Sequence, residues 1–299
     1  MGTLFDGYLI VDWSANNCAK SGKDSIWWCH LLWEAGSLVL VDEQNPTTRL
    51  AAVQQIKAIL LRYKDFQQRL LLGMDFAYGY PLGLAAKVAP GESPPWLAVW
   101  RYLSEQIEDS PRNANNRFEV AAHMNRLLSG STAPFWGCPK TKQSRYLSMR
   151  KPKGEAGELF NEFRLAEQGN PTHSVWKLSY PGAVGSQVLM GLPYLYQLRT
   201  DPELARISRV WPFETGLGPL QESDLTATNI LHAEIYPSLV AVSPKPGEIK
   251  DRLQVIALAE YFADLDYKNE LGRLFAGRRH VSKEERQIIE REEGWILGI

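Results

Sequence analysis

Residues 8–17 read YLIVDWSANN, in which four apolar residues run directly into an aspartate, a tryptophan and a polar turn. A short apolar run that ends at turn residues is typical of a strand buried on both faces of a sheet. The run ends at Asp12, and a buried carboxylate is costly unless it is paired or binds a metal. Asp12 is therefore predicted to be either a cap at a strand end or part of a functional site.

The same pattern returns at Asp75, where an apolar strand leads into the motif DFAYGYP with its Gly/Pro turn. Between the two aspartates, residues 25–43 predict two strands joined at a glycine, because aromatic and β-branched residues dominate on either side. Residues 49–65 carry apolar side chains at helical spacing. A meander followed by a crossover helix brings parallel strands together, so we expect Asp12 and Asp75 to lie side by side.

Residues 90–224 differ from this pattern and predict a mostly helical insertion in a single domain that covers residues 1–299. The spacing of apolar residues predicts helices at 96–109, 117–130 and 157–169, separated by loops rich in Pro and Gly. The glycines of segment 180–193 suit either a loop that lets backbone approach a ligand or a set of tight turns.

Two further carboxylates follow the insertion. Glu234 lies inside the short predicted strand LHAEIYPSL, and Asp251 opens the predicted helix IKDRLQVIALAEYFADLD on its apolar face. Plainer alternatives remain open, since Glu234 could pair with a basic residue and Asp251 could cap its helix. The tail 282–299 predicts a charged helix that ends at Gly294.

Taken together, these four carboxylates indicate a metal site. Buried carboxylates that converge at strand ends repel one another unless divalent cations neutralise them. Carboxylate oxygens suit Mg²⁺ or Mn²⁺, and two such ions can hold both oxygens of a phosphodiester displacement. The predicted catalytic and metal-binding residues are Asp12, Asp75, Glu234 and Asp251.

The motifs VDWSA, GMDFAYGYPLG, AEIYPSL and KDRLQVIALAEYFADLD resemble those of the DUF429 family in order and spacing. That family consists of predicted nucleases with a ribonuclease H-like fold, and the resemblance covers residues 6–90 and 228–299. It implies an α/β fold with a mixed sheet and helices on both faces, the core shared with actin-like ATPases. It also implies carboxylates on the first strand, the fourth strand and the last helix. The chain departs from the family at Gln254, where many members carry a second helix aspartate.

A basic arm, defined as residues 140–153, holds six Lys or Arg and no acid. It predicts either a solvated loop or a segment that grips phosphate groups and carries a stacking aromatic residue. Ser14, in the polar turn after Asp12, could contact phosphate as the corresponding turn does in actin-like ATPases. The predicted substrate-binding residues are Ser14, Lys140, Lys142, Arg145 and Tyr146.

Composition limits the classes of function. The net charge of −1 gives no overall field toward nucleic acid or anionic membranes. Three cysteines without C-x-x-C spacing favour a reducing cytoplasm, and we expect neither a signal peptide nor a membrane span. The sequence thus predicts a nuclease or phosphodiesterase that uses Mg²⁺ or Mn²⁺ on nucleic acid or a small phosphoester. The alternatives are an actin-like phosphotransferase or nucleotide-binding protein, and a non-catalytic module that binds nucleic acid or a partner.

Overall fold

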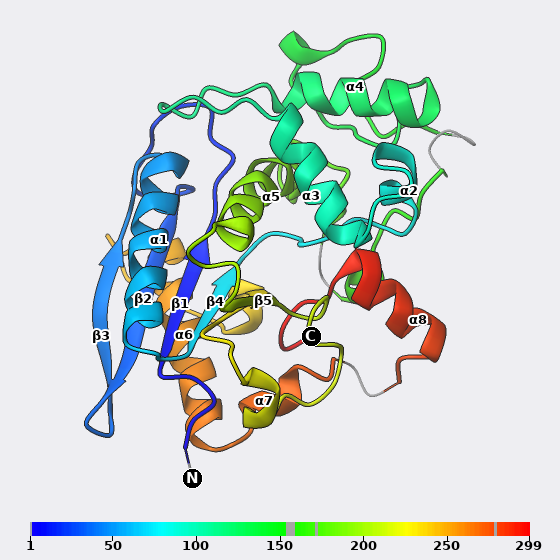
Figure 1. The fold of residues 1–299 in the computed structure, drawn as a ribbon. Helices are drawn as coiled ribbons and strands as arrows, with labels where there is room; N and C mark the ends of the chain where they lie inside the picture. The colour runs from blue at the N-terminus through cyan, green and yellow to red at the C-terminus, as the bar shows by residue number, and fades with distance from the viewer. Residues whose placement is uncertain (1, 154–158, 171–172, 278–279) are drawn as a thin grey trace.

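The computed structural model describes residues 2–153, 159–170, 173–277 and 280–299. These residues form an α/β fold around a six-stranded mixed sheet with the strand order β3-β2-β1-β4-β6-β5 (Figure 1). The first three strands form an antiparallel meander, and β1, β4, β6 and β5 run parallel, as the sequence predicts for β1 to β4. The strands are β1 (Gly7–Asp12), β2 (Trp27–Glu34), β3 (Ser37–Gln44), β4 (Leu70–Met74), β5 (Ser208–Val210) and β6 (Ile230–Glu234).

Helices cover both faces of the sheet (Figure 1). Leu9 and Val11 of β1 share an apolar core with helix α1 (Arg49–Asp65) and helix α5 (Gly185–Thr200). Alternate residues of the same strand, Tyr8 and Ile10, belong to a second core under helix α6 (Lys250–Tyr267). Strand β1 is therefore buried on both faces, as its apolar run predicts.

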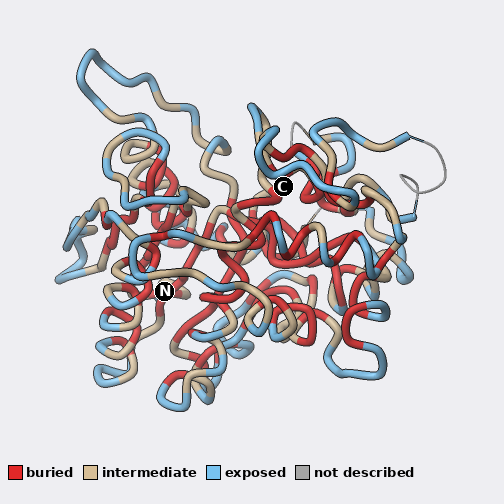
Figure 2. The backbone as a smooth tube through the Cα atoms, turned by 90° about the horizontal axis from the view of Figure 1, so that it is seen from above, coloured by how far each residue is buried: buried red, intermediate tan, exposed pale blue. Residues whose placement is uncertain are grey.

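Viewed from above, buried backbone gathers in the interior and exposed backbone at the periphery (Figure 2). The remaining helical segments are α2 (Leu84–Val88), α3 (Pro95–Gln106), α4 (Arg117–Ser129), α7 (Leu271–Leu274), α8 (Lys283–Ile288) and the short turns η1 (Lys140–Lys142), η3 (Leu165–Glu167), η4 (Glu222–Leu225), η5 (Pro237–Leu239) and η6 (Ile289–Glu293). None of the helices in the described ranges is both long enough and apolar enough to span a bilayer.

Helices α3 and α4 confirm two of the three predicted helices in the insertion. The prediction of a helix at 157–169 is wrong where it can be compared, because residues 159–169 hold only the short turn η3. Residues 157 and 158 lie outside the described residues. The side chain of Arg164 turns inward here to pair with Glu167 and Glu234, so a buried ion pair rather than helical periodicity fixes this segment.

The prediction of a loop or tight turns at 180–193 is confirmed for residues 180–184 but is wrong from Gly185 on, since α5 begins there and continues through Pro193. Its glycines meet a packing requirement. A Cβ atom at Gly191 would lie 2.6 Å from the Phe76 ring, and one at Gly185 would lie 2.3 Å from the Val175 carbonyl oxygen. Glycine here allows a helix to approach the sheet closely, which its sequence alone did not distinguish from a turn.

The charged tail is helical, as predicted, up to Gly294. Ser282 accepts a hydrogen bond from the Glu285 N–H and caps α8. Beyond the helix the chain returns to the sheet, where the Leu297 N–H donates to the Glu234 carbonyl at 2.9 Å.

Candidate active site

Parallel pairing of β1 and β4 places Asp12 and Asp75 at the same edge of the sheet. Val11 and Met74 are partners in the register, so the two aspartates occupy corresponding positions at the strand ends. The Asp75 N–H donates to the Val11 carbonyl at 3.2 Å, and Asp75 Oδ1 accepts from the Trp13 N–H at 2.6 Å. The backbone thus fixes Asp75 beside Asp12, as the sequence predicts.

The two carboxyl groups lie close enough for each to alter the pKa of the other. Burial raises the pKa of Asp12 well above its usual range, and the negative charges of Asp75 and Asp251 raise it further. Burial also raises the pKa of Asp75 to about 6, although hydrogen bonds from Asp12 and Trp13 oppose this. The pair therefore favours holding a proton when no cation neutralises it.

Asp251 approaches these two carboxylates from α6, which is far from both of them in the sequence. It lies in the first turn of α6, and its charge raises the pKa of both Asp12 and Asp75. Its Oδ2 atom accepts a hydrogen bond from the Asp24 N–H at 2.7 Å, in the connection between β1 and β2. The N-cap position is occupied by Ile249. Asp251 thus secures this connection instead of capping its own helix.

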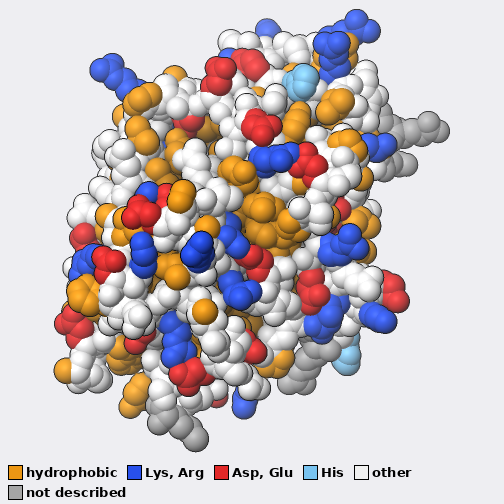
Figure 3. Space-filling view, in the orientation of Figure 1, with side chains coloured by type: hydrophobic (Ala, Val, Ile, Leu, Met, Phe, Trp, Pro, Cys, Tyr) orange, Lys and Arg blue, Asp and Glu red, His pale blue; other side chains and the backbone are white. Residues whose placement is uncertain are grey.

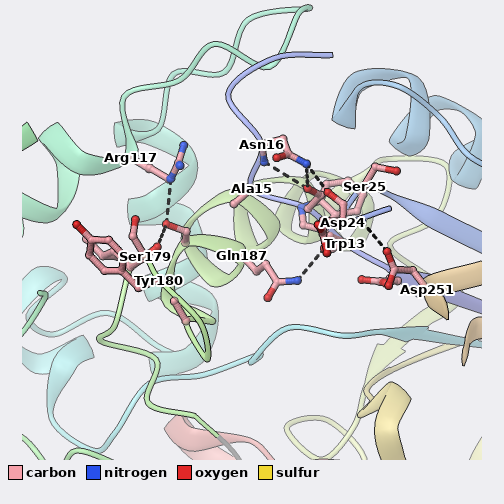
Figure 4. A pocket seen from close by; sticks show the side chains of 15 residues that line it. Trp13, Ala15, Asn16, Asp24, Ser25, Arg117, Ser179, Tyr180, Gln187 and Asp251 are labelled. Atoms are coloured by element: carbon pink, nitrogen blue, oxygen red, sulfur yellow. Dashed lines mark hydrogen bonds between the residues drawn. The ribbon is translucent and has the colours of Figure 1, made fainter. Parts of the chain in front are cut away.

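A cavity of about 580 Å³ opens beside these groups. Asp24 and Asp251 lie on one side, Arg117, Ser179 and Tyr180 on the other, and Gln187 between them (Figure 4). Gln187 Nε2 donates to the Trp13 carbonyl at 2.8 Å and lies 3.5 Å from Asp75 Oδ2. The cavity is lined by Asp12, Trp13, Ser14, Ala15, Asn16, Asp24, Ser25, Arg117, Leu178, Ser179, Tyr180, Ala183, Ser186, Gln187 and Asp251.

Arg49 holds the wall of the cavity that the β1–β2 connection provides. This fully buried side chain forms a two-point ion pair with Asp109, at 2.6 and 2.7 Å, and donates to the carbonyls of Ser14 and Asn16. The Ser14 hydroxyl in turn accepts from the Asn16 amide. Sequence reasoning missed Arg49, although a basic residue at the first position of a helix is electrostatically unfavourable and was a usable signal.

Glu234 is placed at the end of β6, next to Met74 of β4, but it does not line the cavity. Arg164 donates to both of its carboxylate oxygens, at 2.5 and 2.8 Å, and the Tyr78 N–H donates to Oε2 at 2.9 Å. Burial raises the pKa of Glu234, and the Arg164 charge opposes the shift. Among the alternatives left open by the sequence, the structure shows the ion pair. Gln254 does not line the cavity either, and its side-chain amide donates to the Ser238 hydroxyl at 3.2 Å.

The basic arm is largely exposed, apart from the buried Leu147, and contributes no residue to the cavity wall. Lys142 pairs with Glu119, Lys151 pairs with Glu162, and the Arg145 guanidinium lies over the Tyr146 ring. Lys140 begins the exposed turn η1. Of the predicted substrate-binding residues, Ser14 lines the cavity and the four residues of the arm do not.

The carboxylate oxygens of the three aspartates are not arranged as the ligands of a metal ion. Within the described ranges, no group of three or more His, Cys, Asp or Glu side chains has a geometry that could hold an ion. The fold and site thus define an α/β protein with an acidic cavity at the carboxyl ends of parallel strands. No family model, curated protein or solved structure matches the chain.

Proposed function

We propose that this protein is a divalent-metal-dependent phosphodiesterase or nuclease with a ribonuclease H-like fold, related to the DUF429 family. The observation that carries the proposal is the convergence of Asp12, Asp75 and Asp251 beside one cavity. These residues come from the first strand, the fourth strand and the last long helix, which are the positions that the resemblance implies. The antiparallel meander β3-β2-β1 followed by parallel β4 supports the same assignment.

The chemistry of the three carboxylates fits Mg²⁺ or Mn²⁺. Both ions prefer oxygen ligands, and mutual repulsion among carboxylates is what a divalent cation relieves. When bound, such an ion would polarise a phosphoryl oxygen and lower the pKa of water. A carboxylate binds a metal in its ionised form, so the raised pKa of Asp12 means that cation binding would displace a proton. Glu234 is omitted from the proposed ligands, because Arg164 already engages both of its oxygens.

Backbone donors of the chain hold the other two carboxylates in place. The Trp13 N–H fixes Asp75, and the Asp24 N–H fixes Asp251. Each bond leaves the second oxygen of its carboxylate able to accept another partner. Arg49 keeps the connection that contains Trp13 and Asp24 attached to the body of the domain. These contacts limit the reorganisation that ligand binding requires.

Thermal melts with and without Mn²⁺ test the proposal. We expect saturating Mn²⁺ to stabilise the wild-type protein by about 2–3 kcal/mol, a shift of several degrees. Asp12→Asn should abolish that shift while leaving the metal-free protein equally stable or slightly more stable, because one negative charge is removed from the cluster. Asp65→Asn, on an exposed turn of α1, is the matched control and should keep the full shift. An undiminished shift in Asp12→Asn would exclude Asp12 as a ligand.

One observation favours a second candidate, a phosphotransferase or nucleotide-binding protein of the actin-like kind. The β1–β2 connection contributes Ser14, Asn16 and Ser25 to the cavity, and this connection cradles phosphate in that class. A nucleoside triphosphate would then stabilise the protein more than Mn²⁺ alone, and its γ-phosphate would be transferred to an acceptor. Absence of a triphosphate effect, together with Mn²⁺ stabilisation, would leave the hydrolase as the better account.

A further inference from the structure

Arg117 is a buried cation on the cavity wall. Three arginines are buried among the described residues, and two of them are paired, Arg49 with Asp109 and Arg164 with Glu167 and Glu234. Arg117 is only 8% exposed, yet within the described part of the chain no carboxylate lies at ion-pair distance from it. Burial and the charge of Arg49 lower the pKa of Arg117, and the charges of Glu119 and Asp109 offset this only in part. A buried charge without a direct ion pair is costly, which points to an anion that completes it.

Neutral oxygens hold the Arg117 guanidinium in position. Its Nε donates to the Ser186 hydroxyl at 2.9 Å, and its Nη1 donates to the side-chain oxygens of Asn115 and Asn17. The Ser186 hydroxyl in turn donates a hydrogen bond to the Leu178 carbonyl at 2.6 Å. Within the described residues, Nη2 makes no hydrogen bond. The guanidinium is thus oriented by its Nε edge and one terminal nitrogen, and the other terminal nitrogen remains available to an anion.

Tyr180 adds an aromatic surface on the same side of the cavity (Figure 4). Its side chain is large and apolar but 52% exposed, and its O–H donates to the Cys138 carbonyl at 3.3 Å. Its backbone φ is +75°, a conformation that costs energy for any residue except glycine. Strained residues of this kind concentrate at binding sites.

We infer that Arg117 binds the phosphate of a small phosphoester and that Tyr180 packs against the ring attached to it. The planar guanidinium suits phosphate oxygens, and an aromatic face suits a base or sugar. A cavity of about 580 Å³ is of the size that holds small molecules, and the charges of the basic arm lie outside it. A phosphate at Arg117 would lie in the same cavity as Asp12 and Asp251. The substrate class is therefore a mononucleotide-sized phosphoester, and only its hydrolysis rests on the proposed function.

The test is isothermal titration calorimetry of the full chain with inorganic phosphate and with adenosine 5′-monophosphate. Arg117→Met should weaken both by about 10- to 100-fold, the value of a charged hydrogen-bonded contact, and Arg117→Lys should recover part of the loss. Tyr180→Ala should weaken the nucleotide about 10-fold and leave phosphate unchanged, because only the nucleotide has a ring. Arg101→Met, which removes an exposed cation of α3 that pairs with Glu92, should change neither.

The outcomes separate this inference from the proposed function. Equal binding by wild type and Arg117→Met, or no wild-type binding at millimolar concentration, would overturn the inference even if Mn²⁺ still stabilised the protein. Phosphate binding through Arg117 without any Mn²⁺ effect would support the inference and remove the metal-dependent function. Tighter binding of a single-stranded oligonucleotide that depends on Lys140 and Lys142 would replace the small substrate by a nucleic acid. If Arg117→Met fails to fold, Arg117→Lys and Tyr180→Ala decide.

Discussion

Asp12 and Asp75 are carboxyl groups whose environment favours a proton. Both lie at strand ends in a site shared with Asp251, and burial together with mutual repulsion raises the pKa of each. The folded protein therefore binds protons that the unfolded chain would release. Two buried histidines act in the opposite direction, since burial lowers the pKa of His30 to about 4 and that of His232 to about 3.

This difference predicts how stability depends on pH without metal. The pKa of Asp75 rises from 3.8 when unfolded to about 6 when folded, so its contribution is complete below pH 3.8 and is lost as pH rises through 6. Asp12, whose pKa burial also raises, adds to this loss. The free energy of unfolding of Asp12→Asn should therefore rise relative to that of wild type by about 1–2 kcal/mol between pH 5 and pH 8. Urea unfolding in a chelator would measure this gain, and the histidine effects cancel between the variants. A constant difference across that range would contradict the coupling.

For single residues, the sequence predicted the three aspartates of the candidate site but not its two buried arginines. Asp12 and Asp75 stand out because each ends an apolar strand, and Asp251 because it begins an apolar helix face. Arg49 and Arg117 each occupy the first position of a helix, but nothing local identifies most of their partners, which come from distant segments. The destination of Glu234 was equally hidden, because Arg164 lies 70 residues away in sequence.

Among the elements, the β1–β2 connection is held by side chains from other segments of the chain. Arg49, at the first position of α1, donates to the carbonyls of Ser14 and Asn16 and pairs with Asp109. The connection carries a wall of the cavity without regular secondary structure of its own. Arg49 therefore supports the shape of the connection, together with Asn45, Asn113 and Arg117.

We expect Arg49→Met to lower the free energy of unfolding by about 3–5 kcal/mol, because Asp109 is left buried and unpaired. Asp109→Asn in the same background should cost less than the sum of the two single changes. Chemical denaturation of the four proteins in this cycle measures the coupling. Strictly additive effects would show that the ion pair contributes little, and the wall would then need another support.

Element types were predicted better than their packing. Strands β1 to β4 and helices α1 and α6 follow from periodicity, which a local window contains. Helix α5 did not, because Gly185, Gly191 and Pro193 are turn residues by local preference and are retained in the helix by contacts with Phe76 and Val175. Tertiary packing overrides propensity at such positions.

In the whole molecule, the insertion and the sheet share one interior. Core residues of α3, α4 and α5 belong to the same apolar cluster as those of β1 and β4. Outside this cluster, Arg164 of the insertion donates to Glu234 of the sheet and to the Glu293 carbonyl near the end of the chain. These contacts tie segments that are far apart in sequence into one body.

The variant Glu234→Gln tests both the contact between Arg164 and Glu234 and the role of Glu234 in metal binding. Replacement of the carboxylate should lower the free energy of unfolding by about 3 kcal/mol, because the Arg164 charge loses a buried partner. Calorimetry should still show a single transition, since the cores remain shared. The Mn²⁺ shift should equal that of wild type. A stable Glu234→Gln protein that no longer responds to Mn²⁺ would place Glu234 among the ligands.

The strand order also has a consequence for synthesis on the ribosome. Strand β4 can pair with β1 early, but its partners in β6 lie 160 residues further along the chain, as Leu70 pairs with Ile230. At about 5–20 residues per second, the nascent chain spends roughly 10–30 seconds with the β4 edge uncovered. Contacts of such long range slow folding, and an open edge invites pairing with other chains. Chaperone binding before β6 emerges would protect the growing polypeptide during this interval.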